Sequence, residues 1–277
     1  MNVPASLLDL RYAGTGGHVE SWRLVAGDRD GRRGLWLTWS VVGRPRSADR
    51  SDGVVPPLAD ITAVAFDRDE GHVATKVSVP FTSARFMRGA LDVAIDGCEL
   101  SLGKTRGTVE SGDRAIAWDL AVGPELAAPV VHLPKALYAT SIPPLKRVTP
   151  LASGAISGAL QVNGRTWSTD GWRAAITHAW GPSHPHLSAW VHCDAWDDAD
   201  DLVFEGVSAR VRVGPMLSPM ATSLFVRWRG ESWDLGGREI LGQSRGLISL
   251  RRWEATSTSK RLWLRAEIGR ASCRERV

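Results

Sequence analysis

Cysteine is scarce in this chain and long apolar runs are missing, and both features limit what the protein can be. Its three cysteines, Cys98, Cys193 and Cys273, lie far apart in 277 residues and show no CxxC spacing. That distribution excludes a disulfide framework and a cysteine-based zinc site. No segment reaches the ~20 uninterrupted apolar residues of a membrane helix, and the N-terminus lacks the basic start and apolar run of a secretory signal. We therefore expect a cytoplasmic protein without stable membrane insertion.

Familiar catalytic and nucleic-acid-binding motifs are missing as well. The sequence contains no GxSxG, no P-loop, no GxGxxG that opens a helix and no HExxH, which excludes the enzyme classes built on them. The net charge of +4 arises from 34 basic and 30 acidic residues scattered along the chain. Because these charges form no basic stripe, we expect no nucleic acid among the partners.

Helical periodicity is nearly absent, whereas turn residues are frequent, with 28 Gly and 15 Pro. The apolar runs between the turns are short and alternate, as in half-buried strands. In residues 34–42, for example, one face carries Leu35, Leu37, Trp39 and Val41, while Trp36 lies on the other. Further strands are expected at residues 61–66, 72–79, 91–95, 115–122, 130–133, 155–162 and 165–167. The sequence therefore predicts an all-β fold of antiparallel strands.

Two β units follow one another in this prediction. Residues 133–150 contain prolines without alternation, which is typical of a linker, so the expected domains are residues 1–145 and 146–266. Residues 44–57 are polar and form either a plain surface loop or a lid. Residues 267–277, EIGRASCRERV, match the translation of a common short-read sequencing adapter; we expect this segment to be an artefact that truncates the natural chain near Ala266.

The densest set of chemically active side chains lies in residues 171–215, which hold four of the seven histidines and four of the thirteen tryptophans. A strand over residues 173–180 places His178 and Trp180 on one mainly apolar face. His178 can serve a ligand site there, or it can be a core histidine held by a backbone carbonyl.

A second strand, over residues 188–196, separates two kinds of side chain. One face carries small apolar residues that can pack a core. The other carries Trp190, His192, Asp194 and Trp196, which alternate aromatic and titratable groups as the lining of a binding pocket would. His192 could also join His184 and His186 in a metal site, but nothing in their spacing fixes a geometry, so we expect neither a metal nor another cofactor.

A third strand, over residues 202–213, places Glu205 on an otherwise apolar face. An isolated buried charge is too costly, so this carboxylate must be paired, protonated or next to a cavity. Burial would raise its pKa and make it a general acid near neutral pH. The alternative is a structural carboxylate that accepts hydrogen bonds from a neighbouring Arg or Trp.

Several segments carry a family resemblance, among them HVATKVSVPF, DGWRAAITHAWG, AWVHCDAWDD and FEGVSARVRVGPMLSP. They resemble the tocopherol cyclase-like and hydroxyneurosporene synthase-like (AttH-type) group of lipocalin-like proteins. The most specific motif is the His-Asn-Trp-Gly of many relatives, which stands here as His178-Ala179-Trp180-Gly181. The resemblance implies two consecutive lipocalin-like β-barrel or sandwich units with a hydrophobic cavity for prenylated or polyene compounds. It also implies cyclisation or hydration by protonation of an alkene.

From residues and resemblance together we expect a cofactor-independent cyclase, hydratase or isomerase of a lipophilic small molecule. Glu205 or Asp194 would supply the proton and His178 would set the protonation of that acid. Three tryptophans, Trp180, Trp190 and Trp196, would stabilise developing positive charge, with His192 beside them. The alternative is a carrier that binds the same molecule without chemistry. The sequence leaves the oligomeric state open.

Overall fold

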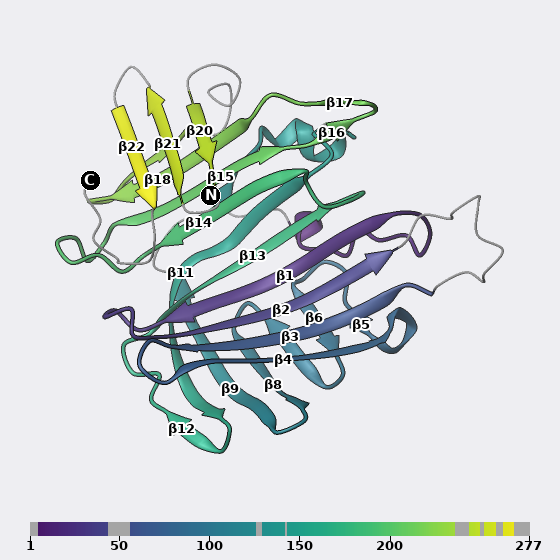
Figure 1. Ribbon diagram of the computed structural model, residues 1–277, viewed down its shortest axis with the longest axis vertical. Coiled ribbons are helices and arrows are strands. Elements are labelled where there is room, and N and C mark those ends of the chain that lie inside the picture. Colours follow the sequence, from purple (N-terminus) through teal and green to yellow (C-terminus); the bar gives the residue numbers. More distant parts are fainter. Residues whose placement is uncertain are drawn as a thin grey trace. The chain divides into compact units, whose positions relative to one another are not determined.

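The computed structural model describes residues 5–43, 56–125, 129–141, 143–235, 244–249, 252–258 and 263–268 (Figure 1). Within these residues the regular structure consists of β-strands and three short 3-10 helices, η1 (Ala5–Leu7), η2 (Phe81–Ser83) and η3 (Lys135–Ala139). The all-β prediction is thus confirmed. None of the described helices is long and apolar enough to span a membrane. Residues 44–55 of the predicted loop and residues 269–277 of the adapter-like segment lie outside the described residues.

The chain divides into two compact units, but not at residue 145. Unit 1 comprises residues 1–129 and 147–183, and unit 2 comprises residues 130–146 and 184–277. The difference arises because β11 (Lys146–Val162) and β13 (Arg173–Gly181) pair with N-terminal strands. The proline-rich segment expected to be a linker contains η3, and its end already belongs to β11.

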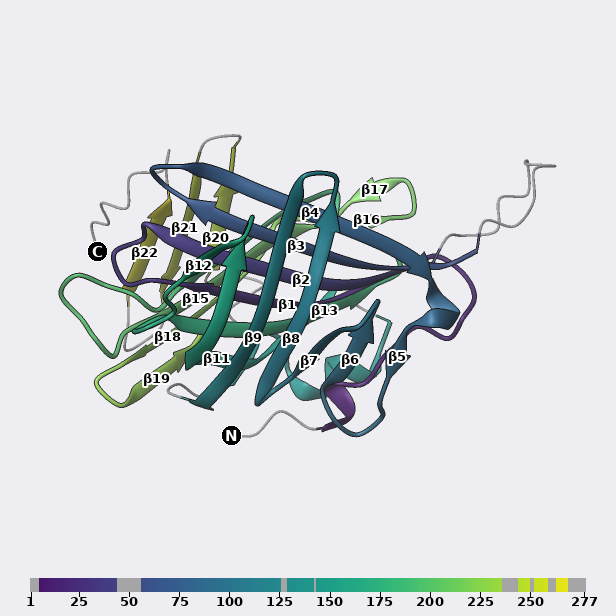
Figure 2. The same cartoon turned by 90° about the horizontal axis from the view of Figure 1, so that it is seen from below.

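Unit 1 is built on one large antiparallel sheet with the strand order β4-β3-β2-β1-β13-β11-β9-β8-β7-β6-β5, and β12 pairs with β11. Strands β3 and β4 also contact β8 and β9, so the sheet curves back on itself (Figure 2). The strands not yet delimited are β1 (His18–Gly27), β2 (Arg33–Gly43), β3 (Leu58–Asp67), β4 (Gly71–Pro80), β5 (Arg85–Phe86), β6 (Asp92–Ile95), β7 (Cys98–Ser101), β8 (Lys104–Ser111), β9 (Arg114–Glu125) and β12 (Arg165–Trp167).

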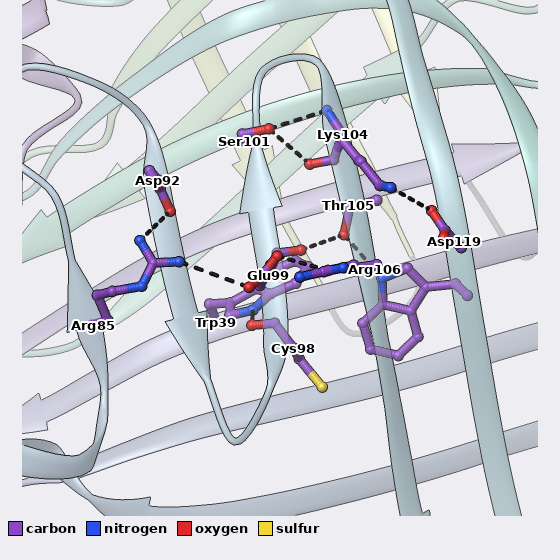
Figure 3. Close-up of polar contacts among 11 residues, drawn as sticks. Trp39, Arg85, Asp92, Cys98, Glu99, Ser101, Lys104, Thr105, Arg106 and Asp119 are labelled. Atoms are coloured by element: carbon purple, nitrogen blue, oxygen red, sulfur yellow. Dashed lines mark hydrogen bonds and ion pairs between the residues drawn. The ribbon is translucent and has the colours of Figure 1, made fainter.

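The interior of unit 1 is a packed core in which two of the buried tryptophans meet. Trp39 is fully buried on β2 and meets Trp118 of β9 edge to face, with ring centroids 6.3 Å apart. Its indole N–H donates to the carbonyl of Cys98 at 2.8 Å, and that of Trp118 donates to Thr105 Oγ1 at 2.9 Å (Figure 3). Because a buried indole needs a hydrogen-bond acceptor, these bonds fix both rings in place.

The outer side of the same strands carries exposed ion pairs. Glu99 accepts from Arg106 Nε at 2.8 Å and lies 3.8 Å from Arg85, which also binds Asp92 at 2.9 Å (Figure 3). Exposed pairs of this kind contribute little to stability, about 0–1 kcal/mol each. The two sides of this part of the sheet therefore follow the alternation of apolar and polar residues that the sequence shows.

Two hairpin turns were also recognisable in the sequence. Asp96-Gly97 and Asn163-Gly164 both have positive φ at each residue, 50° and 75° in the first and 49° and 77° in the second. Two positive φ angles define the type I′ turn, whose twist matches that of the strands it joins. Asn and Gly tolerate this region best, so the turn residues set the register of these hairpins.

Unit 2 contains two antiparallel sheets and a separate hairpin. The first sheet has the order β14-β15-β18-β19 and the second the order β20-β21-β22. Their bounds are β14 (Leu187–Cys193), β15 (Val203–Arg210), β18 (Ala221–Trp228), β19 (Glu231–Asp234), β20 (Ser244–Ile248), β21 (Trp253–Thr258) and β22 (Trp263–Ile268); the hairpin is β16 (Arg212–Val213) with β17 (Met216–Leu217), and β10 (Val130–Val131) also lies in this unit.

One face of the β14–β15–β18 sheet forms the hydrophobic core of unit 2. Phe204, Leu224 and Trp253 are buried together there, and Trp253 Nε1 donates to Ser208 Oγ at 3.0 Å. Gly206 is required at this point, because a Cβ atom would lie 2.7 Å from the Trp253 ring. Side chains alternate across a sheet, so the residues between these core positions face the opposite side.

Candidate functional site

The opposite face of the unit 2 sheet brings together a group of polar side chains around Glu205. His192 of β14 pairs with Glu205 of β15, and Trp190 lies two residues along on the same face. Ser223 of β18 lies opposite Val207, next to them. This arrangement confirms the alternation expected for Trp190 and His192, and it places both beside Glu205.

Glu205 is fully buried and bound by two ring N–H groups. Its Oε1 accepts from His132 Nε2 at 2.7 Å and from Trp190 Nε1 at 3.2 Å. The other nitrogen of His132, Nδ1, lies 2.9 Å from Ser223 Oγ. The buried carboxylate is therefore paired, as a charge inside a protein must be.

His192 differs from His132, since neither of its ring nitrogens has a hydrogen-bond partner among the described residues. Nδ1 is 3.6 Å from Glu205 Oε2 and Nε2 is 3.9 Å from Asp194 Oδ1, which are ion-pair distances but too long for hydrogen bonds. The side chain is only 7% exposed, and the Trp190 ring stacks against it with centroids 6.0 Å apart. A buried imidazole that makes no hydrogen bond is unusual in a protein core and marks His192 as a candidate functional residue.

The charges in this cluster differ from those expected from the sequence. Burial alone would raise the pKa of Glu205, but the contacts with His132 and His192 lower it more, and the net pKa lies well below its usual range. Burial lowers the pKa of His192, yet Asp194 and Glu205 raise it to about 9. The prediction that Glu205 has a raised pKa is therefore wrong. At neutral pH the carboxylate is the anion and the proton resides on His192.

Sequence reasoning did not identify His132 or Ser223. Both are about 5% exposed, and His132 is distant in sequence from the residue it binds. The strand expected at residues 130–133 contained the histidine but gave no reason to single it out. Tyr138, which follows in η3, is also buried, and burial raises its pKa strongly.

A second buried carboxylate, Glu20 of β1, lies in unit 1 and holds His178. His178 Nε2 lies 2.8 Å from Glu20 Oε1, and His18 Nε2 lies 2.8 Å from Oε2. Burial raises the pKa of Glu20, but the hydrogen bonds from His178 and His18 lower it by more than burial raises it, so the net pKa is below its usual value. The same carboxylate accepts from the backbone N–H groups of Arg11 and Tyr12. It therefore ties the N-terminal segment to the sheet.

His178 has no ring nitrogen left for a ligand in this arrangement. Its Nδ1 donates to the Leu7 carbonyl at 2.8 Å, and its ring is stacked on Trp22 with centroids 4.7 Å apart. Trp180 lies beside it at the same centroid distance, as predicted for neighbours on one strand face. This is the geometry of a core histidine held by a backbone carbonyl, the alternative to a role in a ligand site.

The remaining candidates lie outside the Glu205 cluster or at its border. Strand β14 ends at Cys193, so the alternation that would have placed Trp196 beside His192 does not continue. Trp196 instead packs against the hydrophobic core of unit 2, whereas Asp194 stays within ion-pair distance of His192. His184 and His186 are exposed, and among the described residues no three His, Cys, Asp or Glu side chains are placed to hold a metal ion.

Solved structures with the same fold include one protein that is named as an enzyme. No family model and no curated protein matches the sequence. An AttH protein of Nitrosomonas europaea shares the fold with a TM-score of 0.54 and 14% identity over 95% of this chain and 82% of its own. CghA matches with a TM-score of 0.53 and 11% identity over 96% and 80% of the two chains. Kievitone hydratase from Nectria haematococca matches with a TM-score of 0.51 and 11% identity over 91% and 76%.

These matches confirm the AttH-type fold implied by the resemblance, and at such low identity they show the fold alone. CghA was also crystallised with the small molecule Sch210972, and that structure matches with a TM-score of 0.50 over 91% of this chain and 75% of its own. The fold is therefore one in which related structures include a named hydratase and a protein with a bound small molecule.

Proposed function

We propose that the protein is a cofactor-independent cyclase, hydratase or isomerase of a lipophilic small molecule, and that His192 supplies the proton. The observation that carries the proposal is the state of His192, which is buried beside Glu205 and Asp194, is protonated at neutral pH, and makes no hydrogen bond through either ring nitrogen. The fold shared with kievitone hydratase and CghA supports this class of substrate. Isoprenoid and polyene compounds belong to it.

Each neighbour of His192 has a distinct part in this mechanism. Glu205 remains an anion and, with Asp194, holds the imidazole in its charged form. Trp190 donates to Glu205 and presents its ring to the side of His192. In this way the ring can contact the apolar part of a substrate beside His192. His132 does not reach the substrate, because both of its nitrogens are engaged.

The acid strength of His192 limits which substrates it can protonate. An imidazolium with a pKa of about 9 is a weak acid, suited to proton transfer onto an activated carbon rather than onto an isolated alkene. An alkene conjugated to a carbonyl group meets this requirement. An oxygen nucleophile, either a water or a hydroxyl of the substrate, adds to one alkene carbon while His192 gives its proton to the neighbouring carbon. The proton released by the nucleophile returns to the imidazole, so the site is regenerated.

The test is mass spectrometry of lipophilic compounds that copurify with the protein, before and after incubation. The wild-type protein should yield a product that is isomeric with the ligand or heavier by one water, and His192→Gln should bind the ligand without converting it. His184→Gln, at an exposed histidine of the same unit, is the matched control and should behave as wild type. A ligand that remains unchanged with wild-type protein would instead identify a carrier.

A further inference from the structure

A short hairpin extends the β15–β18 ladder of unit 2 beyond the sheet. Its base is closed by two hydrogen bonds between Val211 and Ser218, at 2.9 and 3.0 Å. Strands β16 and β17 then pair up to Val213 and Met216. The two residues between them are Gly214, with φ of 60°, and Pro215. Gly at the first position of a two-residue turn is typical of a type II′ hairpin, so the tip has a defined conformation.

This hairpin carries large apolar side chains into solvent. Met216 is 70% exposed, the highest value among the described large hydrophobic residues, and the adjacent Leu217 is 40% exposed. Leu187, which is 37% exposed, begins the neighbouring strand β14 and pairs with Arg210 at the same end of the sheet. Single exposed apolar residues need no explanation, but a group of them on one ordered tip indicates an interaction surface.

The two strands that lead into and out of this tip carry charge of one sign. From Gly206 to Gly230 the sequence contains four arginines and no acidic residue. Two of the four, Arg210 and Arg212, lie at the base of the hairpin, and Arg212 is exposed. A second copy of the chain docking symmetrically here would bring these cations against each other. The charge therefore favours an anionic partner.

We propose that the hairpin tip, formed by Arg212, Met216 and Leu217 with the adjacent Leu187, docks the protein onto an anionic lipid surface. A projecting apolar tip enters the headgroup layer of a bilayer, while arginines at its base remain at the level of the lipid phosphates. Three apolar side chains and a pair of arginines give a reversible association rather than stable insertion. This proposal does not depend on the reaction assigned to His192.

Cosedimentation of the full chain with vesicles tests the proposal. Wild-type protein should bind vesicles of mixed phosphatidylcholine and phosphatidylglycerol, and added salt should weaken the binding because the cations contribute. We expect the double variant Met216→Ser/Leu217→Ser to bind at least about tenfold more weakly than wild type. The variant Arg212→Gln should bind at least about fivefold more weakly. Met87→Ser, at a residue of unit 1 that is 49% exposed, should bind as wild type.

Three results would overturn the proposal. The first is wild-type protein that stays in the supernatant with mixed vesicles at low salt. The second is equal binding to vesicles of phosphatidylcholine alone, because the arginines would then have no role. The third is a concentration-dependent dimer in sedimentation velocity that the double variant abolishes without any change in vesicle binding, which would identify a second copy as the partner.

Discussion

The substitution Glu205→Gln should lower the pKa of His192 from about 9 toward its ordinary value. The amide keeps the shape of the side chain but removes the negative charge, so that burial, which lowers the pKa of His192, is opposed by Asp194 alone. Two-bond ¹H–¹⁵N NMR spectra of the imidazole rings, recorded as a function of pH, would follow the titration of His192 directly.

The raised pKa of His192 also makes the free energy of unfolding depend on pH. A histidine whose pKa is raised by folding stabilises the native state fully below its unfolded pKa, and this contribution is lost as the pH rises through the folded pKa. For His192 that window runs from about pH 6.5 to 9, and 2.5 units correspond to about 3 kcal/mol at most. Relative to wild type, Glu205→Gln should therefore be less stable at pH 6 by a part of this amount, because Asp194 remains, and the difference should decrease toward pH 10.

Urea unfolding across this pH range provides the measurement, and Glu20→Gln provides the control. Glu20 is likewise buried and bound by two histidines, but it lies in unit 1, so its substitution should leave the titration of His192 unchanged. The reasoning is refuted if His192 of the wild-type protein titrates near pH 6.5, or if Glu205→Gln leaves its pKa near 9.

Three further substitutions test other parts of the structure. His178→Ala leaves the buried carboxylate of Glu20 without one of its two histidine partners; we expect a loss of about 3–5 kcal/mol in urea unfolding and faster proteolysis of the N-terminal segment. Gly158→Ala introduces a Cβ atom 2.2 Å from the Asp119 carbonyl at a φ of 135°, so thermal unfolding should show a loss of more than about 2 kcal/mol. Ser223→Ala removes a hydrogen bond from a buried histidine and should cost about 1–3 kcal/mol in urea unfolding.

The strands were predictable because alternation and turn chemistry are local. Leu35, Leu37 and Trp39 are fully buried on β2, as the alternation of the sequence requires, and Asn163-Gly164 forms the expected turn. The division into units was less accessible, because it depends on which strands pair. Nothing local in β13 indicates that it pairs with β1, from the other end of the chain.

The candidate site was likewise only partly predictable, because it also depends on contacts between distant segments. Alternation correctly placed Trp190 and His192 on one face. It did not predict that Glu205 pairs with His192 across the ladder, and it could not supply His132, which comes from a distant segment. The contacts of His132 and His192 with Glu205 also explain the error in its predicted pKa. The sequence indicated that burial would raise this pKa, but it did not show that the two histidines lower it by more. Glu20 could have been found, because it occupies an inward position of an apolar strand face, as Glu205 does.

The most direct test of the central claim, that His192 delivers a proton to carbon, is incubation of the copurified ligand in heavy water. With wild-type protein the product should carry one deuterium at a carbon that does not exchange in a protein-free control, and His192→Gln should give no such incorporation. Turnover by wild-type protein without deuterium on carbon, or incorporation that persists in His192→Gln, would contradict the mechanism.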